Sequence, residues 1–267
     1  ETAQVMKYLL VQSAAGSVLT DADGNFNFPG VSPPLTCTFS FVGAFNSVGN
    51  AAGTNYSLTQ ALTQTTGNTV LMNPAAISTV TAEANAFNVV DKQRDWVRSI
   101  NPADGTLDFV HFAIVNLNQT CNAYFDGSLI NFFAAGGGCP NTAYSTVVSH
   151  EDGHWANQVY GTGNGSDGMG EGNADTWAEY VWDTPVIAAG FFGPGSELRN
   201  GTNTRPFCGD CCGGCYGEVH TDGEVWMGTT WKVRSRLVNS NGAAAGALIA
   251  NTLFLTWMEA YNQRQIK

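Results

Sequence analysis

The segment His150–His154 reads His-Glu-Asp-Gly-His, the pattern H-E-x-x-H, within a stretch whose apolar residues recur at helical spacing. Side chains at positions i and i+4 lie one above the other on a helix, so the two imidazoles can reach one metal ion. Glu151 stands beside the first histidine, where its carboxylate can act as a general base on a water molecule. The alternative is a pair of histidines on a solvated helix face. The chain has only 4 histidines, which makes a chance pairing at this spacing less expected.

A catalytic zinc site needs three protein ligands and one open position. We expect the third ligand to be Glu171, which opens the next predicted helix. Asp175 follows one helical turn later on the same face and can accept the free N–H of a ligand histidine. The alternative for Glu171 is an acid favoured at a helix N-terminus by the macrodipole.

Two further histidines lie outside this motif. His220 is the candidate donor to an oxyanion that develops beside the metal; the alternative is a loop histidine with a purely structural hydrogen bond. His111 lies in an apolar strand pattern and is interpreted as a core histidine.

The elements that must position these residues run from strands to helices, which predicts an α+β fold. Residues 1–75 are expected to form a β-rich region, with a hairpin turn at Asp23-Gly24. Residues 76–267 are expected to form the catalytic domain. Predicted strands cover 107–115 and 124–133, and predicted helices cover 79–100, 141–160, 171–183, 224–238 and 243–264.

Composition restricts the partners of this 267-residue chain. Its net charge of −11 argues against nucleic acid and anionic lipid, because no basic stripe exists to neutralise phosphates. No run of about 18 apolar residues predicts a membrane span. Only 12% of residues are charged, and Asn-x-Ser/Thr triplets occur at Asn55, Asn118, Asn164 and Asn200. These features favour a secreted protein, and the abrupt first and last residues suggest a piece of a longer precursor.

The chain contains 7 cysteines. We predict that Cys121 and Cys139, which bracket the strand region before the H-E-x-x-H helix, form a disulfide that joins the cleft edge to the helix entrance. Four further cysteines lie close together in the sequence: Cys208, Cys211, Cys212 and Cys215. Their close spacing favours disulfides within a loop over a second metal site, and their connectivity is left open.

The segment from His150 to Asp175 resembles the glutamate-liganded, thermolysin-like zinc peptidases. Gly-Met-Gly-Glu-Gly-x-x-Asp at 168–175 and Gly-Glu-Val-Trp at 223–226 are most similar to the fungalysin family. Cys-Asn-Ala-Tyr-Phe-Asp-Gly at 121–127 resembles the edge strand that pairs with substrate in this group. The resemblance extends over most of the chain after the β-rich region and implies two lobes, one β-rich and one helical, with the H-E-x-x-H helix between them.

The resemblance also implies roles for single residues. It implies that His150, His154 and Glu171 bind zinc and that Asp175 supports a ligand. It implies that Glu151 acts first as general base and then as general acid, and that His220 contacts the oxyanion. For the substrate, it implies main-chain binding by Asn122 and Ala123 and contact of Arg199 with a carbonyl. Two features depart from the family pattern. Asp152 stands where a bulkier residue is common, and can face solvent or perturb Glu151. The acid that orients the oxyanion histidine is unassigned, with Glu218 and Asp222 as substitutes.

The hypothesis that follows is a zinc-dependent endopeptidase that acts on extracellular peptide or protein substrates. Phe132, Phe133, Trp155 and Trp177 favour an apolar pocket near its site. The first alternative is a catalytically idle, peptidase-like structural or adhesive protein that self-associates in a surface layer or filament, which the low charge and the Gly, Asn and Thr content would suit. The second alternative is a carbohydrate- or protein-binding β module within residues 1–75.

Overall fold

The computed structural model describes residues 2–166, 168–207 and 216–260. Its largest element is a sheet of eight strands in the order β2-β1-β3-β4-β6-β8-β7, with β5 paired to β3 outside this path. The strands are β1 (Leu9–Ser13), β2 (Gly16–Leu19), β3 (Leu35–Gly43), β4 (Asn46–Asn50), β5 (Ser57–Leu62), β6 (His111–Leu117), β7 (Ala123–Phe125) and β8 (Ile130–Phe133). Strands from the first 62 residues and from residues 111–133 therefore join in one sheet through the parallel pair β4 and β6.

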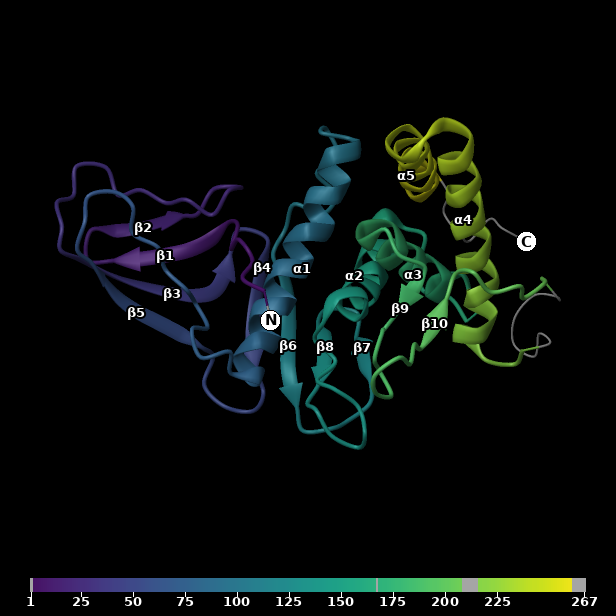
Figure 1. The fold of residues 1–267 in the computed structure, drawn as a ribbon, viewed down its shortest axis with the longest axis horizontal. Coiled ribbons are helices and arrows are strands. Elements are labelled where there is room, and N and C mark those ends of the chain that lie inside the picture. The colour runs from purple at the N-terminus through teal and green to yellow at the C-terminus, as the bar shows by residue number, and fades with distance from the viewer. Residues whose placement is uncertain (1, 167, 208–215, 261–267) are drawn as a thin grey trace.

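The helices follow in the second half of the chain, with one exception, and the prediction of an α+β fold is confirmed. They are α1 (Ser78–Ile100), α2 (Ser145–Tyr160), α3 (Met169–Trp182), α4 (Val219–Asn241) and α5 (Ala243–Ala260). Two short strands, β9 (Val186–Ile187) and β10 (Arg199–Asn200), pair with each other. Figure 1 shows the strands of residues 1–62 on one side, α2 and α3 in the centre, and the α4–α5 pair on the other side.

Two hydrophobic clusters hold the elements together. The larger one packs α1 onto the sheet through Phe41, Phe87 and Phe132, each at most 2% exposed. The second one joins α5 to α2 and α3 around Trp177 and Phe254. Burial of each such side chain contributes about 1.5–3 kcal/mol. Phe132 and Trp177 are thus buried in the core, and the prediction that they line an apolar pocket is wrong.

Several predicted boundaries differ from the structure. The hairpin in the first region turns between Ser13 and Gly16, and Asp23-Gly24 forms a separate turn in which the Gly24 N–H donates to Asp21. Helix α2 begins at Ser145 because residues before it hydrogen-bond to the sheet. The Thr142 hydroxyl accepts from the backbone N–H of Phe133 at 2.8 Å. Helix α4 begins at Val219, so His220 lies in its first turn instead of in a loop.

Helix α5 is the one helix in the described part of the chain that is long and apolar enough to cross a membrane, by length and composition. Its Phe254, Leu255 and Met258 are buried in the second cluster. Such packing is also that of a core helix, so the sequence-based prediction of no membrane span stays a prediction.

The disulfide between Cys121 and Cys139 confirms the predicted pair. It joins the residue two before β7 to the loop that leads to α2, with the two Cα atoms 5.3 Å apart. Cys37 is buried and free, and the four cysteines between 208 and 215 lie outside the described residues.

Replacing both Cys121 and Cys139 by Ser is expected to lower the free energy of unfolding by about 3 kcal/mol, because the bridge closes a loop with a sequence separation of 18 residues. Urea denaturation followed by circular dichroism measures this. An unchanged midpoint in the double variant would show that the bridge does not stabilise the fold.

Candidate metal centre

Helix α2 presents His150 and His154 on one face, as the i, i+4 spacing predicts. Both side chains are buried, and their Nε2 atoms lie 3.2 Å apart. Among the described residues, His150, Glu151 and His154 form one group whose potential ligand atoms lie within 4.8 Å of one another. Two nitrogens this close can share at most one proton, whereas a single metal ion can bond to both.

Each imidazole is held at its other nitrogen. His150 Nδ1 lies 2.8 Å from Asp175 Oδ1, and His154 Nδ1 lies 2.9 Å from Asn164 Oδ1. Carboxylate and amide oxygens only accept hydrogen bonds, so each Nδ1 carries the proton and donates it. Both Nε2 atoms can then direct a lone pair to the same point, which is the tautomer that metal ligation needs.

Glu171 brings a further potential ligand atom to the two histidines from the first turn of α3. Its Oε2 lies 3.2 Å from His150 Nε2 and 3.4 Å from His154 Nε2. A tetrahedral zinc ion with ligands at 2.0–2.1 Å separates them by about 3.4 Å, so the three atoms fit this ion. The buried Oε2 also lacks a hydrogen-bond donor among the described residues, as expected for an atom whose partner is a cation.

The carboxylates around the two imidazoles favour a positive charge at this site. Burial lowers the pKa of His150, but Asp175 and Glu171 outweigh it and raise this pKa to about 10. Burial also raises the pKa of Glu171, yet the two histidines hold it far below its ordinary value. A proton or a metal ion can supply the required charge, and only the metal ion satisfies all three ligand atoms together.

Glycines set how closely α3 approaches α2. A Cβ on Gly153, which lies between the two histidines, would be 3.0 Å from Ala174 Cα and 3.1 Å from Trp177 Cβ. On the other side of α3, a Cβ on Gly172 would be 2.8 Å from the carbonyl oxygen of Gly223. The contacts at Gly153 and Gly172 allow three helices to pack closely enough for Glu171 to reach the histidines.

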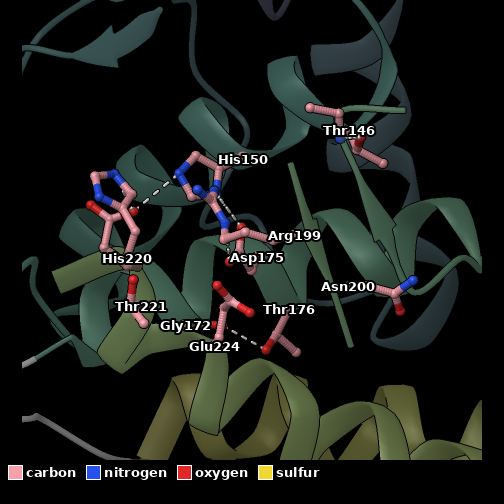
Figure 2. Close-up of polar contacts among 12 residues, drawn as sticks. Thr146, His150, Gly172, Asp175, Thr176, Arg199, Asn200, His220, Thr221 and Glu224 are labelled. Atoms are coloured by element: carbon pink, nitrogen blue, oxygen red, sulfur yellow. Dashed lines mark hydrogen bonds and ion pairs between the residues drawn. The ribbon is translucent and has the colours of Figure 1, made fainter. Parts of the chain in front are cut away.

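Asp175 and Arg199 form a buried pair behind His150. Arg199 Nε and Nη2 donate to Asp175 at 2.7 and 2.8 Å, and Nη2 lies 3.4 Å from His150 Nδ1. Figure 2 shows His150 and Arg199 meeting at Asp175. Asp175 therefore lies where a carboxylate that orients His150 is expected. The guanidinium of Arg199 is directed at this carboxylate, and its contact with a substrate carbonyl stays a prediction.

His220 faces the same centre from the first turn of α4. Its Nε2 lies 3.4 Å from Glu171 Oε2, and its side chain is 46% exposed. Its Nδ1 hydrogen-bonds Glu218, which also caps the helix by accepting from the Thr221 N–H at 3.0 Å. Of the two acids considered from the sequence, Glu218 is the one in place to orient His220. Burial raises the pKa of Glu218, but hydrogen bonds from His220 and Thr221 together lower it to about 2, so it is an anion.

Asp152 does not face solvent. It is fully buried, and its Oδ1 bonds Nδ1 of His111 on β6. This contact corrects the expectation that Asp152 faces solvent, because the acid packs on the side of α2 toward the sheet. A perturbation of Glu151 by Asp152 stays a prediction. His111 is buried, as predicted for a core histidine.

The edge strand β7 begins at Ala123 and, within the described part of the chain, pairs only with β8. Asn122 precedes it, and its carbonyl accepts from the Thr142 hydroxyl at 3.0 Å. The disulfide holds the same segment. An open strand edge can add a substrate strand, and this role of Asn122 and Ala123 stays a prediction.

Asn164 is the residue of this centre that the sequence did not single out, except as a glycosylation triplet. Besides His154 Nδ1, it accepts from Asn157 Nδ2 at 3.0 Å and donates to the His154 carbonyl at 3.0 Å. It lies in the glycine-rich loop between α2 and α3, whose conformation no periodicity predicts. An amide in the loop between two ligand segments is the signal that could have indicated it.

Replacing Asn164 by Ala is expected to weaken zinc affinity about 10- to 100-fold, because the His154 ring loses the acceptor that fixes its tautomer. Competition with a chromogenic chelator measures this affinity. Asn118→Ala is the matched control, since Asn118 is exposed and also begins an Asn-x-Ser/Thr triplet. Equal affinities of the two variants would exclude the positioning role.

Comparison with known proteins gives structural relatives alone. No protein-family model and no curated protein matches the chain. A solved structure does: the precursor of protealysin, a metalloproteinase from Serratia proteamaculans, is similar with a TM-score of 0.59 and 14% identity. The match covers 82% of this chain and 76% of that chain. The fold is that of a protealysin-like, thermolysin-type metallopeptidase. At this identity the likeness concerns the fold, so activity is inferred below from the site.

Proposed function

We propose that this protein is a zinc-dependent endopeptidase with His150, His154 and Glu171 as ligands and Glu151 as general base. One observation carries the proposal: the three ligand atoms lie 3.2, 3.2 and 3.4 Å apart, with both histidine tautomers fixed from behind. The metallopeptidase-like fold supports it.

Bound zinc would supply a Lewis acid that lowers the pKa of water and stabilises negative charge on a substrate oxygen. The protein's own groups do the rest. Glu151, 6% exposed and next to the first ligand, takes the proton of the attacking water and returns it to the leaving amine. Burial raises the pKa of this carboxyl, which makes it a stronger base. His220 contacts the substrate oxygen as charge develops there.

Substrate binding would use the open edge of β7, where Ala123 offers main-chain hydrogen bonds. Arg199, which holds Asp175, would contact a substrate carbonyl. The disulfide and the low charge support action on extracellular proteins after secretion. Within the thermolysin-like group, the segments at 168–175 and 223–226 support a fungalysin-like relationship.

Metal analysis tests the proposal directly. The purified protein is expected to contain about one zinc ion per chain, to hydrolyse an unfolded protein, and to lose this activity with a chelator and regain it with zinc. His154→Ala is expected to lower both zinc content and activity. Full zinc content with no hydrolysis of any unfolded substrate would favour the idle, structural alternative. Zinc-free protein that hydrolyses peptides would refute the metal site.

A further inference from the structure

Helix α3 carries three acids one turn apart: Glu171, Asp175 and Glu179. The first faces the two imidazoles, and the second binds His150 and Arg199. Glu179 is fully buried, and neither of its carboxyl oxygens has a hydrogen-bond partner within residues 2–166, 168–207 and 216–260. A buried, unpaired polar group is costly, so its presence at this position calls for an explanation.

Glu179 lies against the turn that follows β10. A Cβ on Gly201 would be 1.9 Å from Glu179 Oε1 and 2.8 Å from Trp231 Cβ on α4. The carboxyl therefore packs directly on the Gly201 backbone, whose N–H donates to the Pro185 carbonyl at 2.8 Å. Arg199 lies two residues before this glycine, so Glu179 supports the strand that carries Arg199.

Burial and the neighbouring charges together favour the neutral form of Glu179. Burial raises its pKa well above the ordinary value, Asp175 on the same helix raises it further, and Arg234 on α4 opposes both. The Arg234 guanidinium is committed elsewhere, since it donates to Asp183 at 2.7 Å and to Asn251 at 2.8 Å. Arg199 is likewise bound to Asp175. Asp175 is then the single anion that His150 and Arg199 share.

We propose that Glu179 is a positioning residue: its carboxyl packs on Gly201, holds β10 against α3 and thereby keeps Arg199 on Asp175. Asp175 in turn fixes His150. The relevance of this contact for metal binding rests on the metal site of the proposed function, and its relevance for activity rests on the proposed hydrolysis as well.

A double-mutant cycle tests the proposal, with zinc affinity as the main readout. Glu179→Gln keeps shape and neutrality, and is expected to retain wild-type zinc affinity within about twofold. Glu179→Ala removes the support, and is expected to weaken it about tenfold, as is Arg199→Ala. Because Glu179 acts through Arg199, the double variant with both alanines is expected to lose no more than Arg199→Ala alone.

Two results would overturn the proposal. A loss in Glu179→Gln as large as that in Glu179→Ala would mean that an ionised carboxylate is needed, and a double variant whose loss is the product of the single losses would mean that Glu179 does not act through Arg199. Should Glu179→Ala not fold, Glu179→Asp replaces it, because the shorter side chain withdraws from Gly201. Weakened zinc affinity in that variant supports the proposal, and wild-type affinity refutes it.

Infrared difference spectroscopy gives an independent readout. The spectrum of wild type minus Glu179→Gln at neutral pH is expected to show the carbonyl band of a protonated carboxylic acid, and a carboxylate band there would overturn the proposal.

Glu83→Gln is the matched control, since Glu83 is a fully buried acid on α1 that contacts Asn50 and Tyr56 away from the metal centre. It is expected to leave zinc affinity and the ratio kcat/KM unchanged. If wild type binds zinc but hydrolyses nothing, the proposed function fails while the zinc cycle still decides the role of Glu179.

Discussion

Replacing Glu151 by Gln is expected to reduce hydrolysis of an unfolded protein on the order of 10³-fold while zinc stays bound. Gln has the same shape but cannot take a proton from water. The three proposed ligand atoms belong to His150, His154 and Glu171, so the substitution removes none of them. Initial rates on an unstructured substrate and zinc content by atomic absorption give the two measurements.

The neighbouring acid provides the matched control. Asp152→Asn changes an equally buried carboxyl in the same helix, but on the side that packs against His111. This variant is expected to lose stability, because the buried partner His111 is left with a weaker bond, and to keep most of its rate per folded molecule. Hydrolysis that survives in Glu151→Gln would show that another group is the base. Loss of zinc in that variant would show that its effect acts through the metal.

The H-E-x-x-H pattern predicted the ligand pair because the relation between i and i+4 is local. Any helix that contains His150 and His154 brings their side chains to one face. Glu171 needed more information, because its distance to the histidines depends on how α2 and α3 cross. It was indicated by the need for a third ligand from the next predicted helix and by the resemblance to known peptidases. The pairing of Cys121 with Cys139 was predictable because both bracket one short strand region.

What escaped prediction depends on contacts between segments. Asn164 reaches His154 through a loop conformation, and Asp152 is buried because α2 packs on β6 at His111. The turn chemistry of Asp23-Gly24 was recognised correctly as a turn, but the hairpin forms earlier, between Ser13 and Gly16, because β1 pairs with the next strand directly. A turn signal gives local backbone geometry and does not say which strands will pair.

The glycine of the H-E-x-x-H motif gives the other large expected effect. Replacing Gly153 by Val is expected to weaken zinc affinity about 100-fold and to lower the free energy of unfolding by about 3 kcal/mol. Even a Cβ at this position would lie 3.0 Å from Ala174 Cα, which is backbone and cannot turn aside as a flexible side chain can. The two methyl groups of Val must therefore push α3 away from α2, and Glu171 moves with α3.

Calorimetric titration with zinc and urea denaturation measure the two effects of Gly153→Val. Gln158→Val is the matched control, because it places the same β-branched residue in α2 at an exposed position, where the Gln158 side chain donates to the Gly127 carbonyl. The control is expected to change unfolding by well under 1 kcal/mol and to leave zinc binding intact. Because Gly153 contributes no ligand atom, selective loss of zinc in its Val variant would show that helix spacing assembles the site. Wild-type zinc affinity in Gly153→Val would instead mean that Glu171 reaches the histidines without the close crossing of α2 and α3.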